Sequence, residues 1–337
     1  MIISAGLFRS DELKAWALDN SVAGQCEVSG KKDSLVDTAQ LSDFFSALFA
    51  MFEENADGRK LSDAIQKDWK LFIDDSLPEE VLPILLPELG MPLTADSKVK
   101  YKNTVTEPCD RWIEIKKALR TERRFFAGDL IQDEDKWDVF FASNYTIKEG
   151  TLFRRARIND DEKKLYSTES ELGMPPAEKA PAGRANTYGI PYLYLGDNEQ
   201  TVMYESRALV KDILSIASYR TTDDLDVVDF TFKPDLFGVY QQSEDDFLSD
   251  VQRYVFLNEV AQDLSKAVRR YDNKEIDYLP TQFVCEYIRL VTAAKGLIFQ
   301  SAQYPEGKNI VLFNDEKVHY EGVEHKVVGT VRMEYAI

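Results

Sequence analysis

The hydrophobic pattern of the chain changes near residue 140, and this change limits the possible folds more than any other feature. Before it, large apolar residues recur at steps of three and four, as on one face of an α-helix. After it, short apolar runs bounded by Gly, Pro, Asn and Asp alternate with helical segments. The 337 residues suffice for two domains. The sequence therefore predicts a helical domain over residues 1–140 and a mixed α/β domain over residues 145–337.

Three amphipathic helices are predicted in the first part. Their apolar faces are Leu41, Phe44, Phe45, Leu48 and Phe52; then Leu61, Ile65, Trp69 and Phe72; then Trp112, Ile115 and Leu119. Between the second and third helices, prolines are expected to break the chain into short pieces, at positions 78, 83, 87 and 92. Gly90 is expected to follow a helix end.

In the second part, strands are expected within 145–158 and over 189–197, 213–222, 225–232, 295–301, 307–315 and 325–335. Helices are expected over 198–210, 255–268 and 281–294. The strand lengths and short turns favour a split, mostly antiparallel sheet over a doubly wound parallel one. The predicted fold class is therefore α+β.

The net charge of the chain limits the classes of molecule that it can bind. With 41 Lys and Arg against 59 Asp and Glu, the formal net charge is −18. A surface this acidic repels phosphate backbones, so general nucleic-acid binding is not expected, although a local basic site could hold a phosphorylated small molecule. Only two histidines occur, His319 and His325. Because both lie near the C-terminus, His-rich metal sites and His-dependent triads are nearly excluded in the first three hundred residues.

The cysteines and the apolar segments indicate a cytoplasmic protein. Cys26, Cys109 and Cys285 are far apart and form no CxxC pair, which suits a reducing compartment. The first residues lack a basic region and a long apolar core, so no signal peptide is expected. The most apolar later stretch, Leu41–Phe52, is too short to span a bilayer, and no membrane association is predicted.

Common catalytic motifs are absent from the sequence. There is no GxGxxG, no glycine-rich loop ending in Gly-Lys-Ser or Gly-Lys-Thr, no HExxH and no GxSxG. One loop is prominent instead: residues 172–186, LGMPPAEKAPAGRAN, a long proline-rich segment that ends in Gly-Arg-Ala-Asn. Long loops of this kind within a compact domain are often functional.

Six segments of the second part together resemble a known family. They are FRRARI at 153–158, GRAN at 183–186, GIPYLYLGDNEQTVMYESR at 189–207, YLPTQFVCEYIR at 278–289, IFQS at 298–301 and NIVLF at 309–313. In this order they resemble the RES-domain family, named for Arg, Glu and Ser, over roughly residues 145 to 337. The resemblance implies a fold like that of diphtheria-toxin-type ADP-ribosyltransferases and a role as the toxin of a bacterial toxin–antitoxin pair. It also implies cleavage of NAD+ at the nicotinamide glycosidic bond.

The first part resembles, less specifically, the helical N-terminal domain that accompanies some RES domains. That domain often begins with a CxxCF…CxxC zinc knuckle. The matching stretches here are Ser4–Phe8 and Cys26–Gly30, in which only Cys26 remains, so no zinc site is predicted. A ribonuclease activity would need an Arg and a His a few residues apart. This part contains no histidine, and the activity is not expected.

The implied reaction sets the residue types that a site would need. The leaving nicotinamide is cationic and departs neutral, so no general acid is required. A carboxylate can stabilise the oxocarbenium-like ribose, and guanidinium groups match the diphosphate oxygens. An aromatic ring can form a wall against nicotinamide or ribose. No metal is required.

The resemblance assigns these roles to particular residues. Glu205 is the implied catalytic carboxylate, Arg184 a diphosphate ligand, and Tyr194 and Ser301 further site residues. Each of these residues could also have an ordinary structural role. Glu205 could be a surface residue paired with Arg207, Arg184 an ordinary loop cation, Tyr194 a core residue and Ser301 a turn residue. Asn186 could contact the ligand or fix the loop; both readings stay open.

The FRRARI segment leaves two registers open. Aligning its Arg-Ala-Arg-Ile makes Arg155 the NAD+ ligand, whereas aligning its aromatic residue makes Arg154 the ligand. Side chains of consecutive strand residues point to opposite faces, so only one of them can serve. We choose Arg155; Arg157 lies on the same face and could assist it.

Three functions compete at this point. The leading one is an NAD+ glycohydrolase or its phosphorolytic equivalent; the others are an ADP-ribosyltransferase acting on a protein and a non-catalytic regulatory module with an NAD pocket. No chemistry is assigned to residues 1–140, which are expected to pack on the catalytic domain, form a homodimer or receive a partner such as an antitoxin. A purely structural role is the alternative.

Overall fold

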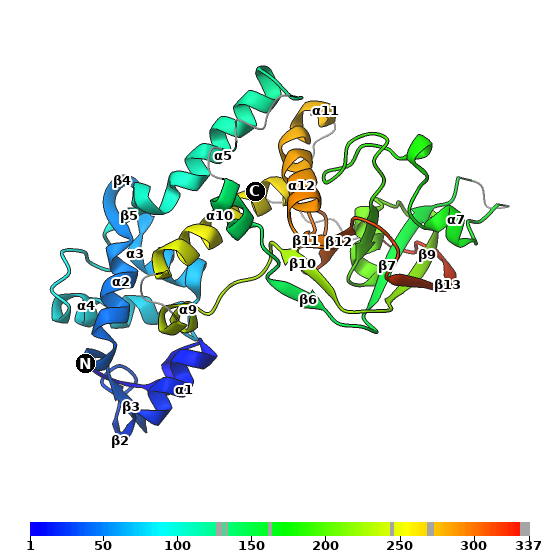
Figure 1. Ribbon diagram of the computed structural model, residues 1–337. Helices are drawn as coiled ribbons and strands as arrows, with labels where there is room; N and C mark the ends of the chain where they lie inside the picture. Colours follow the sequence, from blue (N-terminus) through cyan, green and yellow to red (C-terminus); the bar gives the residue numbers. More distant parts are fainter. Residues whose placement is uncertain (126–130, 132–133, 161–163, 243–245, 268–272, 331–337) are drawn as a thin grey trace. The chain divides into compact units, whose positions relative to one another are not determined.

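The computed structural model describes residues 1–125, 131, 134–160, 164–242, 246–267 and 273–330. The chain forms two compact units (Figure 1). Unit 1 comprises residues 1–110 and 233–256, and unit 2 comprises 111–232 and 257–337. These limits differ from the predicted boundary at 140–145. Helices α5 (Asn103–Thr121) and α10 (Phe247–Ser265) each contribute residues to both units.

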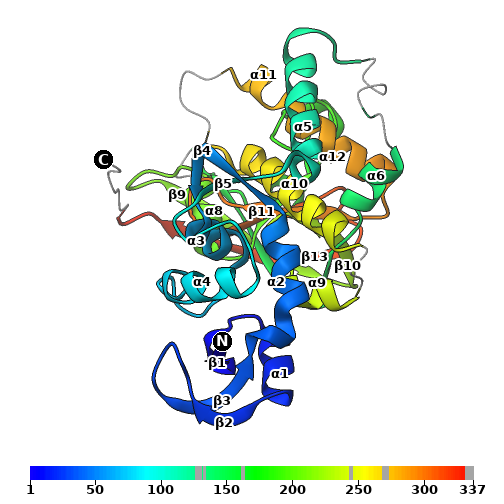
Figure 2. The ribbon, with the colours of Figure 1, turned by 90° about the vertical axis from the view of Figure 1, so that its left-hand side faces the viewer.

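Unit 1 was predicted to be helical, but it also contains two antiparallel sheets. Strands β1 (Ile2–Ser4), β3 (Lys32–Asp37) and β2 (Val22–Gln25) form one sheet in that order, beside helix α1 (Asp11–Asp19) in Figure 2. Strands β4 (Phe52–Lys60) and β5 (Lys98–Tyr101) form the other. Strand β4 is polar and largely exposed, so its sequence carries no apolar alternation that could reveal it.

The predicted helical faces of unit 1 are confirmed in part. Helices α2 (Ser42–Ala50) and α3 (Leu61–Ala64), the latter continued by a π-helical turn (Ile65–Trp69), bury most of their predicted residues in one core with α9 (Leu236–Gln242). Three further predicted residues are buried in this core but lie outside the helices: Leu41 ends a 3₁₀-helix, Phe52 begins β4 and Phe72 follows the π-helical turn. The prediction that prolines fragment the next segment was wrong. Helix α4 (Leu77–Glu88) runs through Pro83 and Pro87, because its apolar face is buried and outweighs the lost backbone donors. Gly90 follows this helix with φ +64°.

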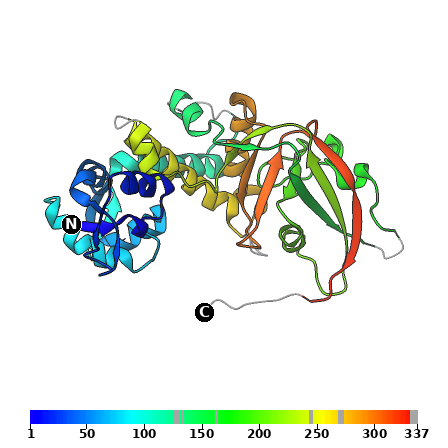
Figure 3. The ribbon, with the colours of Figure 1, turned by 90° about the horizontal axis from the view of Figure 1, so that it is seen from below.

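Unit 2 is built on an eight-stranded sheet with the order β13-β9-β7-β8-β12-β11-β10-β6, and Figure 3 shows β13 in red at one edge. The strands are β6 (Tyr145–Ile147), β7 (Leu152–Ile158), β8 (Leu193–Gly196), β9 (Ile213–Thr221), β10 (Leu225–Asp229), β11 (Gly296–Gln300), β12 (Lys308–Leu312) and β13 (Val318–Val327). Neighbouring strands pair antiparallel except β10 with β11. The predicted α+β class with a mostly antiparallel sheet is confirmed.

The sheet splits between β7 and β8. Strand β7 pairs with β9 along its whole length, whereas it meets β8 only through Arg154 and Gly196. The two strands therefore separate beyond this pair, and the backbone of β8 there lacks a regular neighbour on one side.

Besides its parts of α5 and α10, unit 2 contains the helices α6 (Glu134–Phe140), α7 (Glu169–Leu172), α8 (Glu199–Glu205), α11 (Lys274–Asp277) and α12 (Leu279–Val291). Helix α8 is shorter than predicted and ends at Glu205, because Arg207 takes a left-handed backbone conformation with φ +53°. The last strand, β13, begins earlier than predicted, and residues 331–335 of that prediction lie outside the described residues. Among the described helices, none has the length and apolar content needed to cross a membrane.

Candidate active site

A pocket of about 350 Å³ lies in unit 2 beside the split in the sheet, within the size range of small-molecule sites. On strands β8, β11 and β12, alternate side chains enter the core on one face, while Tyr194, Phe299 and Asn309 face the pocket on the other. The lining residues are Arg155, Ala156, Arg184, Tyr194, Leu195, Val202, Glu205, Ser206, Phe299, Ala302 and Asn309. Four of the predicted site residues are thus brought together: Arg155 of β7, Arg184 of the loop before β8, Tyr194 of β8 and Glu205 of α8.

Glu205 is held by only one of its two carboxylate oxygens. It is the last residue of α8, and its Oε1 accepts hydrogen bonds from Ser301 Oγ at 2.6 Å and from Asn309 Nδ2 at 2.8 Å. Among the described residues, Oε2 accepts none. The carboxylate is therefore fixed at one oxygen and leaves the other for a ligand in the pocket.

The turn between β11 and β12 supports this end of α8. Ser301 Oγ accepts the backbone N–H groups of Gln303 and Tyr304 and also donates to Glu205. Ser301 therefore stabilises the turn and at the same time contacts the predicted catalytic carboxylate. The ring of Tyr304 stacks on that of Tyr204, with centroids 5.2 Å apart and planes 6° from parallel. Ser301 is buried and is not among the pocket-lining residues.

The loop that carries Arg184 is held by the first turn of α12. Gln282 Nε2 donates to the carbonyls of Gly183 and Asn186 at 2.8 and 3.0 Å, and Thr281 Oγ1 donates to the carbonyl of Arg184 at 2.7 Å. Both donor side chains are buried. This contact explains why the PTQ and GRAN segments occur together: one fixes the backbone of the other.

The guanidinium of Arg184 lies at the pocket with little compensation for its charge. It sits over the ring of Tyr278, 5.3 Å from the centroid, and donates to the carbonyl of Lys266. Burial lowers the pKa of Arg184, whereas the electrostatic attraction of Tyr278 and Glu205 acts in the opposite direction. A partly desolvated cation of this kind favours an anionic ligand.

Tyr194 and Asn186 form the base of the same loop. The Tyr194 hydroxyl donates to Asn186 Oδ1 at 2.6 Å and accepts the Ala185 N–H at 3.1 Å, and burial raises the pKa of Tyr194. Asn186 Nδ2 donates to three loop carbonyls, those of Pro181, Thr187 and Ile190. Asn186 therefore fixes the loop, and Tyr194 both supports the loop and lines the pocket. A Cβ on Gly183 would lie 2.4 Å from the Tyr194 hydroxyl, so only glycine fits there.

The structure places Arg155, and not Arg154, at the pocket. Arg155 Nη1 donates to the Tyr194 carbonyl at 2.9 Å and so occupies the split between β7 and β8. Its buried Nε has no partner among the described residues, and burial lowers the pKa of Arg155, with the nearby charge of Arg157 acting in the same direction. Arg154 instead binds Ser218. Arg157 lies over the Tyr166 ring and donates to the Glu171 carbonyl, away from the pocket lining.

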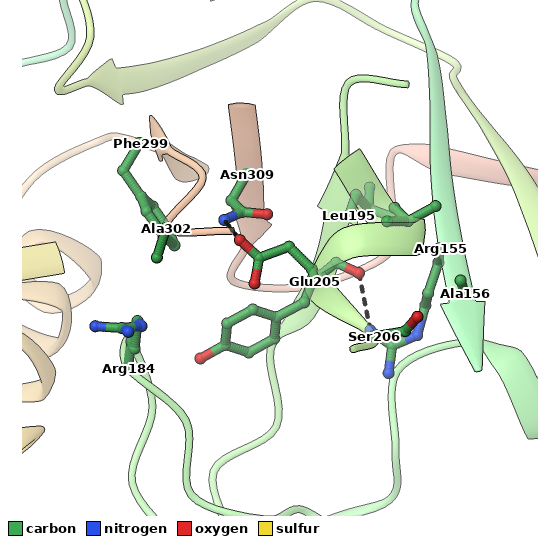
Figure 4. A pocket seen from close by; sticks show the side chains of 11 residues that line it. Arg155, Ala156, Arg184, Leu195, Glu205, Ser206, Phe299, Ala302 and Asn309 are labelled. Carbon is green, nitrogen blue, oxygen red and sulfur yellow. Dashed lines mark hydrogen bonds between the residues drawn. The ribbon is translucent and has the colours of Figure 1, made fainter. Parts of the chain in front are cut away.

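Figure 4 shows the resulting arrangement of charge. The Glu205 carboxylate lies between Arg184 on one side and Arg155 on the other, and the Asn309 amide approaches it from β12. In such a pocket the two cations can bind an anionic molecule, while the carboxylate places a negative charge beside the middle of the bound molecule.

Sequence reasoning missed Asn309, Gln282 and Thr281 as functional residues. All three lie inside segments that carried the family resemblance, and each is a polar residue within an apolar strand or at the start of a helix. That position was the available signal. Their partners are about 100 residues away, and no local pattern identifies them.

The remnant of the zinc knuckle in unit 1 is a single buried thiol. Cys26 Sγ accepts the backbone N–H groups of Ser4 and Ser29 at 3.3 and 3.4 Å. Within the described part of the chain, no group of three or more His, Cys, Asp or Glu side chains is placed to hold a metal ion. The absence of zinc stays a prediction.

Comparison with known proteins identifies the family. A family model described as RES domain matches residues 153–333, more than half of the chain and every pocket-lining residue. The chain belongs to the RES domain family. This family is generally associated with NAD-related toxin activity, and its members are typically toxins paired with antitoxins. No curated protein matched the chain.

Proposed function

We propose that the protein cleaves the N-glycosidic bond between nicotinamide and ribose in NAD+. One observation carries this proposal: in a RES domain, a carboxylate with one free oxygen lies between two arginines in a single pocket. The diphosphate of NAD+ needs cations, and the ribose carbon that loses nicotinamide needs an anion. The pocket offers both charges in adjacent positions.

In the proposed reaction, the bond from ribose C1′ to the nicotinamide nitrogen breaks, and its electron pair neutralises the pyridinium. The ribose becomes an oxocarbenium ion, and the negative charge of Glu205 stabilises it. Water then adds to C1′ and loses a proton to the solvent, which yields ADP-ribose. Inorganic phosphate in place of water would yield ADP-ribose phosphate. Neither route requires an oxidant, a general acid or a metal.

The remaining residues bind and orient the substrate. Arg184 and Arg155 would hold diphosphate oxygens, since both guanidinium groups line the pocket and burial lowers the pKa of each. The Tyr194 ring would form the wall against nicotinamide or ribose. Ser301 acts through Glu205, because its hydroxyl donates to the carboxylate.

The test is to incubate the full-length protein with NAD+ and to follow nicotinamide release. Free ADP-ribose indicates hydrolysis, and ADP-ribose phosphate indicates phosphorolysis. A labelled protein indicates ADP-ribosyl transfer, the competing enzymatic function. If the protein is folded, NAD+ persists and no ADP-ribosylated product forms, both enzymatic functions are excluded. The remaining hypothesis is then the non-catalytic regulatory module. Activity lost in EDTA would overturn only the metal-free part of the proposal.

In cells, the proposed activity predicts a toxin that depletes NAD+ unless an antitoxin binds it. Expression of the wild-type chain should lower cellular NAD+ and arrest growth, whereas a chain with Glu205→Gln should do neither. The antitoxin is the expected protein partner, as for other members of the family.

A further inference from the structure

Asn309 occupies a rigid position in the pocket wall. It lies near the start of β12, an interior strand of the eight-stranded sheet, and is paired with Phe299 of β11 on one side and with Gly196 of β8 on the other. A residue paired on both sides has little freedom of the backbone, so its Cβ direction is set by the sheet.

The Asn309 side chain extends from this position to Glu205. Its Nδ2 donates to Glu205 Oε1 at 2.8 Å, the same oxygen that accepts from Ser301, and Figure 4 shows the amide nitrogen directed at the carboxylate. The amide oxygen of Asn309 has no hydrogen-bond partner within the described chain. One carboxylate oxygen thus receives two donors, Ser301 from the β11–β12 turn and Asn309 from β12, and the other receives none among the described residues.

We infer that Asn309 is a positioning residue that orients the Glu205 carboxylate, so that its free oxygen meets the reacting ribose. This inference rests on the proposed function and adds a residue to it. Ser301 has a rotatable hydroxyl on a turn, whereas Asn309 donates from a fixed strand through an amide that never titrates. Asn309 therefore defines the direction of the carboxylate.

The residue type at position 309 follows from this role. An aspartate of the same shape would place a second carboxylate within 2.8 Å of Glu205, and two like charges at that distance share a proton rather than both ionise. An alanine would leave Glu205 Oε1 with Ser301 alone. The two substitutions therefore predict different pH dependences.

The first experiment compares NAD+ turnover by wild type and Asn309→Ala across pH. We expect kcat to fall by about 10- to 100-fold, the effect of losing one hydrogen bond to a charged group, with KM changed less than about threefold.

The matched control is Tyr304→Phe in the same β11–β12 turn. It removes a hydroxyl that bonds Gln200 and Glu306 and retains the stack on Tyr204, without touching Glu205 or the pocket lining. Its kcat should equal that of wild type. A loss as large as that of Asn309→Ala would mean that any disturbance of the turn lowers activity, and would overturn the specific role of Asn309.

The second variant is Asn309→Asp, which preserves shape. We expect it to be less active than Asn309→Ala at pH 8 and to gain activity as the pH falls, since a shared proton restores a single charge at the pair. A purely structural Asn309 predicts near-wild-type activity for this isostere. Thermal melting verifies the fold of each variant, and Asn309→Asp serves as the test if Asn309→Ala melts below the assay temperature.

The outcomes separate this inference from the proposed function. If wild type releases no nicotinamide, the proposed function fails and the inference fails with it. If wild type is active and folded Asn309→Ala or Asn309→Asp matches its kcat and pH profile, only the inference is overturned.

Discussion

The hydroxyl of Ser301 donates a hydrogen bond to Glu205 Oε1 at 2.6 Å across 96 residues of sequence. It joins the end of helix α8 to the end of strand β11, and Asn309 of the neighbouring strand donates to the same oxygen. A carboxylate held this way needs little reorganisation when positive charge develops beside it, which is the condition for electrostatic catalysis.

The first prediction concerns the charge of Glu205. Glu205→Gln keeps the shape of the side chain and removes the charge that would meet the oxocarbenium ion in the proposed reaction. We expect kcat to fall by about 100- to 1,000-fold while the Kd for NAD+ changes little. Nicotinamide release measures kcat, and calorimetry measures binding. The control is Glu199→Gln at the exposed start of the same helix, where the carboxylate pairs with Lys326. Wild-type turnover by Glu205→Gln would remove Glu205 from the mechanism.

The second prediction is that Arg184→Ala weakens NAD+ binding more than it lowers kcat. Arg184 would contact phosphate oxygens equally in the ground state and the transition state, and such contacts appear in KM. Loss of one charged contact predicts an increase in KM of about 10- to 100-fold. Steady-state kinetics measures this against Lys179→Ala, an exposed cation of the same loop. An unchanged KM for Arg184→Ala would show that Arg184 is not a diphosphate ligand.

The third prediction separates the two neighbouring arginines of β7. Arg155→Ala should raise KM for NAD+ by at least about tenfold, because it removes a pocket cation and the donor to the Tyr194 carbonyl. Arg154→Ala removes a contact to Ser218 outside the pocket lining and should leave KM within about threefold of wild type. Steady-state kinetics on both variants provides the comparison, and the reverse order would favour the other register of the FRRARI segment.

The spacing of apolar residues along the sequence predicted those elements whose side chains are buried along one face. The apolar faces of α2, α3 and α5 were found because buried residues recur at helical steps along one segment. Strand β4 was missed because backbone pairing with β5, and not side-chain burial, makes it a strand. The domain limits were missed because residues 233–256, far along the chain, belong to the core of unit 1.

The site was predicted only as far as the motifs of the family reach. Glu205, Arg184, Tyr194 and Arg155 lie in recognisable segments and line one pocket. The hydrogen bonds that orient them join residues about 100 positions apart, such as Asn309 to Glu205 and Gln282 to Gly183. Composition and periodicity contain no information on such pairs, so the supporting residues required the structure.

The fourth prediction concerns stability at alkaline pH. Tyr219 in β9 is 2% exposed, its hydroxyl has no partner in the described part of the chain, and burial raises its pKa to about 12, against the opposing charge of Arg155. Below about pH 10 the hydroxyl is neutral in both the folded and the unfolded state. Between about pH 10 and 12 only the unfolded state ionises, so the free energy of unfolding falls as the pH rises.

Tyr219→Phe removes this titration and a buried hydroxyl without a partner. We expect its free energy of unfolding to equal that of wild type at pH 8, or to exceed it by up to about 1 kcal/mol. Between pH 8 and 11 it should fall less steeply than that of wild type. Urea unfolding at both pH values measures the slope, with Tyr145→Phe, 48% exposed, as the control. Equal slopes for wild type and Tyr219→Phe would contradict the prediction.

The last prediction is that residues 145–337, the catalytic domain expected from the sequence, aggregate when expressed alone. This fragment keeps the segment 233–256 but loses residues 111–144 of unit 2 and the rest of unit 1, in whose core Phe237 and Phe247 are buried. In the full chain both rings pack edge-on against Phe44, with centroids 5.1 and 6.5 Å away. Two exposed phenylalanines with their apolar neighbours form a patch that soluble domains rarely tolerate.

Light scattering and size-exclusion chromatography of the fragment and the full chain measure this difference. The same fragment with Phe237→Asp and Phe247→Asp should be more soluble, because the substitutions remove the exposed apolar rings. An insoluble fragment rescued in this way assigns the first half of the chain a structural role in covering residues 233–256. A soluble, monomeric fragment with unchanged NAD+ turnover would show that unit 1 is dispensable for folding and catalysis, and the structural account of it would be wrong.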